Sequence, residues 1–110
     1  FARGTGVEQS WEQAVENYRL AVSGGDEDAS WKLGDCYNRG LGVERNDVSA
    51  FNCYRRSALA GSFIGMRKMA IALLDGRGVR QDRETGLKLL RRAAEGGDDN
   101  ARFLLEQKSE

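Results

Sequence analysis

A segment of the form Gly-x-Gly-Val occurs three times in this sequence, and its copies begin at Gly4, Gly40 and Gly76. Successive copies are 36 residues apart. The same spacing relates other residues of similar character: Ala14, Ala50 and Gly86; Tyr18, Tyr54 and Leu90; Gly25, Gly61 and Gly97. A repeat of this length corresponds to one supersecondary unit that cannot bury its apolar face alone, so consecutive copies must stack into one continuous core.

Each period contains two stretches with apolar residues at helical spacing. We call the helix after a glycine turn the leading helix and the helix after Gly-x-Gly-Val the trailing helix. In the middle copy, Leu33, Cys36 and Tyr37 share one side of the leading helix, as Tyr54 and Ala58 do on the trailing helix. The pattern predicts an all-α chain, an α/α superhelical solenoid of right-handed turn. Its helices are expected at about 11–23, 27–39, 47–60, 63–75, 83–95 and 99–107.

Capping residues stand at the predicted helix boundaries. Side chains that accept hydrogen bonds from first-turn N–H groups precede all six helices: Ser10, Asp26, Asn46, Ser62, Asp82 and Asp98. Glycines, which reverse the chain at helix ends, follow five of them: Gly24, Gly40, Gly61, Gly76 and Gly96. The sequence has 14 Gly and no Pro, which agrees with helices that end in glycine turns.

The whole chain, residues 1–110, is expected to form one solenoid domain that is a fragment of a longer array. Phe1 lies one period before Tyr37, so residues 1–3 are predicted to be the last turn of a leading helix that begins earlier. The copies are expected at 1–25 (partial), 26–61, 62–97 and 98–110 (partial).

The middle copy carries the pattern of a known family. Residues 29–43 read Ala-x-x-x-Leu-Gly-x-x-Tyr-x-x-Gly-x-Gly-Val, and residues 50–61 read Ala-x-x-x-Tyr-x-x-Ser-Ala-x-x-Gly. This closely resembles the Sel-one-like repeat, an α/α relative of the tetratricopeptide repeat. The tetratricopeptide repeat itself fits less well, because its period is about 34 residues and it usually contains a Pro. The resemblance implies an adaptor or scaffold whose repeats have no chemistry of their own.

Charge and composition argue against several other classes of protein. Lys plus Arg and Asp plus Glu both number 17, and no long basic run is present, so nucleic acid is not an expected partner. No apolar stretch approaches the roughly 20 residues of a membrane span, so we expect no membrane insertion. The chain has no His and no Cys-x-x-Cys pair, which excludes the usual zinc sites.

Catalysis and cofactor binding are not expected either. The carboxylates at helix starts, such as Asp26 and Asp98, are better explained by the helix dipole than by acid–base chemistry. The Gly-x-Gly-Val segments lack the preceding strand and the third glycine of a phosphate-binding loop. We therefore predict neither catalytic, metal nor cofactor-binding residues.

Two groups of residues leave alternatives open. Cys36 and Cys53 fall on buried sides of neighbouring helices and are either two free thiols or a disulfide, which would imply an oxidising compartment. Arg19, Arg55 and Arg91 share one repeat position, and form either a solvated outer face or a basic ridge for an anionic partner.

The predicted partner-binding surface lies on the leading helices. Trp31, Arg67 and Phe103 share one repeat position, about 160° around the helix from the side of Leu33. A mixture of aromatic, arginine and polar side chains is typical of interface hot spots. The predicted concave face comprises Trp31, Asp35, Asn38, Arg67, Ile71, Leu74 and Phe103. The alternative is that the large ones pack between successive leading helices.

Together these features predict a module that binds a protein or peptide partner, as an adaptor or scaffold within a larger protein. The alternative is a structural spacer or regulatory domain that is attached to a catalytic domain and binds nothing itself. Binding of a partner by the isolated chain distinguishes the two.

Overall fold

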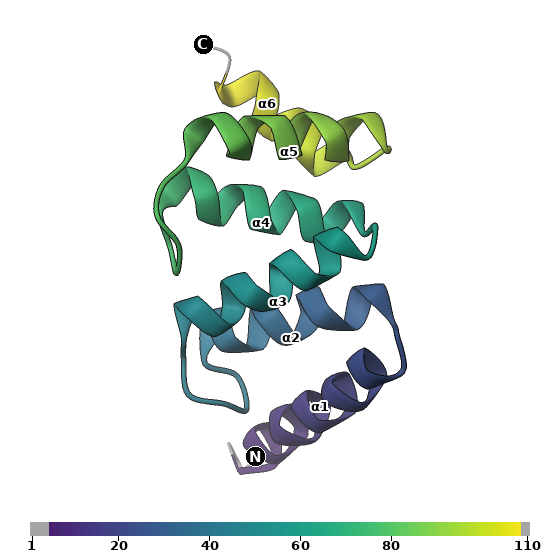
Figure 1. Cartoon of the computed structure of the whole chain (residues 1–110). Helices are drawn as coiled ribbons and strands as arrows, with labels where there is room; N and C mark the ends of the chain where they lie inside the picture. The colour runs from purple at the N-terminus through teal and green to yellow at the C-terminus, as the bar shows by residue number, and fades with distance from the viewer. Residues whose placement is uncertain (1–4, 109–110) are drawn as a thin grey trace.

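The computed structural model describes residues 5–108, which form six α-helices stacked in chain order (Figure 1). They are α1 (Thr5–Ser23), α2 (Glu27–Arg39), α3 (Asp47–Leu59), α4 (Phe63–Asp75), α5 (Arg83–Glu95) and α6 (Asp99–Lys108). These residues contain no strand, and α1 and α6 lie at opposite ends of the stack. The predicted all-α solenoid is confirmed, whereas residues 1–3, the predicted end of a leading helix, lie outside the described residues.

Five of the six helices begin at the predicted residue, and α1 is the exception. It begins at Thr5, so residues 5–7 of the first Gly-x-Gly-Val segment are helical and the predicted N-cap Ser10 lies inside the helix. The later segments are loops anchored to the helix before them, as where the Asn46 N–H donates to the Tyr37 carbonyl at 2.9 Å. No such anchoring helix precedes α1 among the described residues, and the prediction that this helix begins after Ser10 is wrong.

The other predicted helix starts are confirmed by hydrogen bonds. Five side chains accept from backbone N–H groups in the first turn of the helix that follows: Asp26, Asn46, Ser62, Asp82 and Asp98. At the far ends of α2 and α4, Gly40 and Gly76 take the left-handed conformation with φ of 69° and 71°. Sequence signals of about 1 kcal/mol each therefore fix where these helices begin and end.

Each helix packs against the next one along the chain, and α2 also contacts α4. One apolar cluster spans four helices and contains Ala58, Met66, Ala70, Leu74, Leu90, Ala93 and Ala101. A second cluster joins α1 to α2 through Val15, Leu33 and Cys36. Both clusters reach α3, the first through Ala58 and the second through the partly buried Cys53, and the stack measures 45 × 27 × 24 Å. The contact between α2 and α4 brings two leading helices together and builds the site described next.

Candidate functional site

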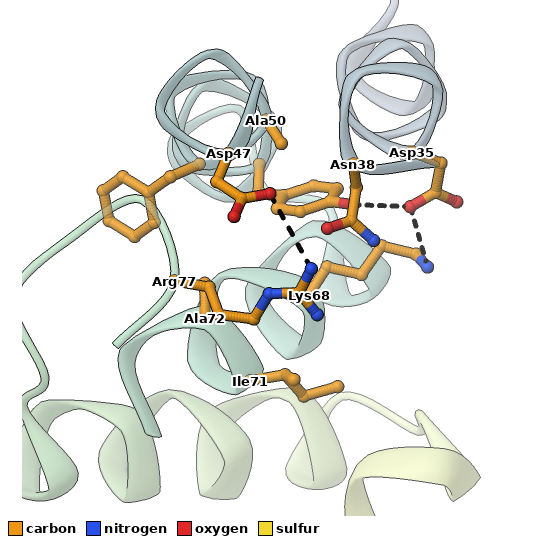
Figure 2. Close-up of a pocket in the computed structure, with 10 residues that line it drawn as sticks. Asp35, Asn38, Asp47, Ala50, Lys68, Ile71, Ala72 and Arg77 are labelled. Carbon is orange, nitrogen blue, oxygen red and sulfur yellow. Dashed lines mark hydrogen bonds and ion pairs between the residues drawn. The ribbon is translucent and has the colours of Figure 1, made fainter. Parts of the chain in front are cut away.

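A pocket of about 120 Å³ lies between α2, α3 and α4 (Figure 2). Three of the predicted partner-binding residues, Asp35, Asn38 and Ile71, line it. The other lining residues are Asp47, Ala50, Phe51, Tyr54, Lys68, Ala72 and Arg77. Since a cavity of about 150 Å³ can hold a benzene-sized group, this pocket has room for one side chain.

Asp35 connects three helices at one side of the pocket. Its Oδ1 accepts a hydrogen bond of 2.7 Å from the Tyr54 hydroxyl on α3 and lies 3.2 Å from the Lys68 ammonium on α4. Burial of Tyr54, together with its hydrogen bond to Asp35, raises the pKa of the phenol, so Tyr54 remains a donor at neutral pH. One oxygen of the Asp35 carboxylate, Oδ1, is therefore already engaged by two groups of this chain.

Asp47, the first residue of α3, forms the opposite side of the pocket. Its Oδ2 lies 3.3 Å from the Arg45 guanidinium. Its Oδ1 is buried, accepts no hydrogen bond from the described residues and lies 3.7 Å from the Arg77 guanidinium. Arg77 belongs to the loop between α4 and α5, so the pocket combines side chains from two successive repeats.

The position of Arg77 follows from the close packing of its loop against the start of α3. Gly78 has a φ of 73°, and a Cβ placed on it would collide with the carbonyl oxygen of Asp47. A side chain at this position would therefore lift the loop from the start of α3. The second glycine of the Gly-x-Gly-Val segment thus allows the close approach that brings Arg77 to the pocket.

Asn38 lies between the two ion pairs, as Figure 2 shows. Its side-chain amide makes no hydrogen bond to any residue within the described part of the chain. A half-buried amide has one acceptor and two N–H donors, which are normally satisfied. Asn38 is therefore a partly buried lining residue whose side-chain amide is available to a bound group.

Trp31 lies beside the pocket and contacts α4. Its indole N–H donates to Asp28 Oδ1 at 3.0 Å, and the Lys68 ammonium lies 5.3 Å from the ring centroid. The same Asp28 oxygen accepts from the Ser62 hydroxyl at 3.1 Å. Trp31 therefore packs toward the next leading helix, which was the alternative to an exposed anchor, but it is only partly buried.

The remaining three predicted residues do not join this pocket. Leu74 is only 8% exposed and belongs to the core under α5, so the prediction that it lies on an accessible face is wrong. The cause is Gly86, which has no side chain and lets α5 approach Leu74 closely. Arg67 is engaged by Asp98, and Phe103 is 59% exposed on α6, apart from the lining residues.

Lys68, Asp47 and Arg77 were missed by the sequence-based prediction. Lys68 shares a repeat position with Lys32, which the helical spacing places on the polar side. Arg77 occupies the variable position of a Gly-x-Gly-Val segment, where the first two copies have Thr5 and Leu41. A charged residue at this variable position is the signal that could have found it.

The two cysteines and the three arginines for which the sequence left alternatives open lie outside the pocket. Cys36 and Cys53 are free thiols in the same apolar cluster, and burial raises the pKa of both. Arg19, Arg55 and Arg91 are exposed along the trailing helices.

Within residues 5–108, no group of three or more His, Cys, Asp or Glu side chains could hold a metal ion. None of the helices in that range is long and apolar enough to cross a membrane.

The 36-residue spacing and the geometry of the helix pairs agree with a match to a known family. The family model for the Sel1 repeat matches residues 1–26, 27–62 and 64–98. The chain belongs to the Sel1 repeat family. Proteins built from Sel1 repeats are generally scaffolds that bind protein partners, and the repeat fold is generally non-catalytic.

Solved Sel1 repeat structures have the same arrangement of helices. A Sel1 repeat protein from Oxalobacter formigenes is 32% identical with a TM-score of 0.79, and the match covers 86% of this chain and 39% of that one. A protective antigen of uropathogenic Escherichia coli with an SLR fold is 34% identical with a TM-score of 0.78, and the match covers 89% and 24%.

A third structure extends the likeness in fold alone. The cysteine-rich protein B of Helicobacter pylori is 20% identical, with a TM-score of 0.78 over 83% of this chain and 68% of that one. No curated protein matches this chain. The chain spans less than half the length of the first two structures.

Proposed function

We propose that this chain is a protein-binding module and that its partner docks on the face formed by α2 and α4. The pocket between α2, α3 and α4 carries the proposal, because it joins an apolar wall to polar groups that this chain leaves unused. Asn38 offers an amide there that bonds to none of the described residues, and Trp31, which is only partly buried, lies beside it against Lys68. Tryptophan next to polar groups that set register is a frequent composition of interface hot spots.

Six residues form the proposed contact surface, four of them predicted from the sequence, and the other three predicted residues are assigned other roles. Trp31, Asp35, Asn38 and Ile71 remain candidates for contact with the partner, and Lys68 and Arg77 join them. Arg67 and Leu74 support the fold, and Phe103 extends the apolar surface of α6. A spacer without binding activity has no need of an unused amide in a half-buried pocket.

The experiment compares variants on the two sides of the helix stack. A partner isolated with the 110-residue chain is purified, and its affinity for wild-type and variant chains is measured by calorimetry. Trp31→Ala is expected to weaken binding by at least about 30-fold, the loss of about 2 kcal/mol typical of an anchor residue. Arg55→Ala and Leu59→Ala, both on exposed trailing-helix positions, are expected to change the affinity less than twofold.

Thermal unfolding separates loss of the docking surface from loss of the fold. Trp31→Phe keeps an aromatic ring toward Lys68 and is expected to retain most of the affinity if area is what the partner uses. If Trp31→Ala keeps the wild-type affinity and Arg55→Ala loses it, the partner docks on the trailing helices. Failure of the isolated chain to bind any partner supports the spacer.

A further inference from the structure

The pocket between α2, α3 and α4 has more free donors than free acceptors. The Arg77 guanidinium has five N–H donors and makes no hydrogen bond to a described residue; it forms a 3.7 Å ion pair with Asp47. Lys68 has three donors and is paired with Asp35. The amide of Asn38 adds two donors that nothing in the described chain accepts.

Most acceptors in the pocket are engaged or closed off, and the exceptions are the Asn38 side-chain oxygen and Asp35 Oδ2, which accept nothing from the described residues. Asp35 Oδ1 takes both the Tyr54 hydroxyl and the Lys68 ammonium. Asp47 Oδ1 is buried away from solvent, so an incoming donor cannot reach it without displacing Arg77. The hydrogen-bonding capacity left for a bound group is therefore mainly that of donors.

The charges around the pocket have the same asymmetry. Two carboxylates, Asp35 and Asp47, are paired with three cations, Arg45, Lys68 and Arg77. The first turn of α3 adds the positive end of a helix dipole next to Asp47. The lining residues alone are balanced, and Arg45, just outside the lining, brings this cluster to one net positive charge. Arg77 is the lining cation with the longer ion pair, and its side chain is 45% exposed. A cationic group would be repelled here, whereas an anionic group would be attracted.

From this surplus we infer that the pocket binds the carboxylate of an acidic side chain, Asp or Glu, presented by an extended segment of the partner protein. The inference rests on the proposed function and specifies the chemistry of the same surface. Arg77 turns from its long contact with Asp47 to the incoming carboxylate, while Arg45 continues to neutralise Asp47. Lys68 and Asn38 donate from the other side, and Ile71 contacts the methylene groups of the acidic residue.

The test uses small probes on the whole 110-residue chain, observed by amide proton–nitrogen NMR. The acidic probe is N-acetyl-glutamate α-methylamide, and its neutral isostere is the corresponding glutamine derivative. Saturating shifts at the amides of Asn38, Lys68 and Arg77 are expected with the acidic probe, and at least tenfold weaker binding with the neutral one. The affinity for the acidic probe should fall as salt rises, because the attraction is between partly exposed charges.

Matched arginine variants test the role of Arg77. Arg77→Gln and Arg80→Gln each remove one positive charge from the same loop, but Arg80 does not line the pocket. Arg77→Gln is expected to lower the affinity for the acidic probe at least tenfold, and Arg80→Gln is expected to lower it less than twofold. Asn38→Ala, which removes an amide without an intramolecular bond, should also weaken it and provides the test if Arg77→Gln unfolds the loop.

Three results would overturn the inference. They are equal affinity for the glutamate and glutamine probes, unchanged affinity of Arg77→Gln and Asn38→Ala, and tighter binding of N-acetyl-leucine, whose carboxylate is a chain end. The proposed function fails separately. Trp31→Ala could still weaken binding of the protein partner while the acidic probe does not bind the chain. In that case the docking face is supported, and the inference that the pocket binds an acidic side chain is wrong.

Discussion

Arg67 on α4 holds the carboxylate of Asp98 at the start of α6, with its Nε 3.2 and 3.1 Å from the two Oδ atoms. The side chains are only 15% and 6% exposed. Asp98 Oδ1 also accepts from the Ala101 N–H at 3.0 Å, so one carboxylate both caps α6 and ties it to α4. A residue predicted to contact a partner thus joins consecutive copies of the repeat.

Arg67→Ala is therefore expected to lower the free energy of unfolding by roughly 3 kcal/mol, because it leaves Asp98 buried without its cation. Urea denaturation of the variant and of wild type measures the difference. Arg55→Ala removes an exposed arginine that forms no ion pair with the described residues, and it should cost no more than about 0.5 kcal/mol. Similar losses from the two variants would show that the Arg67–Asp98 pair is not buried in solution.

The positions of the helices could be predicted because their signals are local. The side chains of Asp26 and Asn46 bind N–H groups two or three residues away, and Gly40 and Gly76 adopt positive φ within their own turns. Such signals are readable from the spacing in the sequence alone. The 36-residue period then repeats them, so each copy supports the assignment of the others.

The pocket could be predicted only in part because it depends on contacts between copies. Asp35 and Asn38 were found from the face of one helix, whereas Arg77 reaches the pocket through a loop that rests on Asp47 from the preceding copy. Leu74 was misplaced for a related reason. One helical wheel does not show that Gly86 lets α5 cover that side of α4.

Replacement of a core leucine should cost far more than replacement of an exposed one. Leu33 is 8% exposed in the cluster between α1 and α2, and Leu59 is 76% exposed at the end of α3. Leu33→Ala is expected to lower the free energy of unfolding by about 2 to 5 kcal/mol, and Leu59→Ala by less than about 0.5 kcal/mol. Chemical denaturation monitored by circular dichroism measures both, and equal costs would mean that the buried faces are assigned wrongly.

Acid should weaken the start of α5 through Asp82. The carboxylate accepts from the Thr85 backbone N–H and hydroxyl at 3.1 and 2.7 Å, and these bonds lower its pKa below the ordinary value of 3.8. Because the pKa of Asp82 is lower in the folded chain than in the unfolded chain, its ionised carboxylate stabilises the fold at pH values above the unfolded-state pKa. This contribution is lost as the pH falls through the folded-state pKa.

Asp82→Asn isolates this effect, because asparagine keeps an acceptor at the N-cap and takes up no proton. The difference in melting temperature between wild type and variant should be constant between about pH 5 and 7. Below pH 3.8 it should shift in favour of the variant. A difference that stays constant down to about pH 2 would show that Asp82 has no lowered pKa in the folded chain.

The packing of the α4–α5 loop against α3 should be sensitive to a single methyl group at Gly78. Gly78 and Gly97 both have positive φ, 73° and 107°, but a Cβ at Gly97 meets no atom within 4 Å, whereas one at Gly78 collides with Asp47. Gly97→Ala is expected to cost roughly 1 to 3 kcal/mol from backbone strain alone. Gly78→Ala adds the collision, an extra 1 to 3 kcal/mol or so typical of overpacking, and moves Arg77 away from the pocket.

Two measurements on these variants connect the loop to the binding site. The melting temperature should be highest for wild type, lower for Gly97→Ala and lowest for Gly78→Ala, because only Gly78→Ala lifts the loop from α3. The acidic probe should bind Gly97→Ala as it binds wild type and bind Gly78→Ala at least tenfold more weakly, since Arg77 no longer faces Asn38. If Gly78→Ala is as stable as Gly97→Ala and keeps the probe, the loop does not rest on Asp47 and the placement of Arg77 needs another cause.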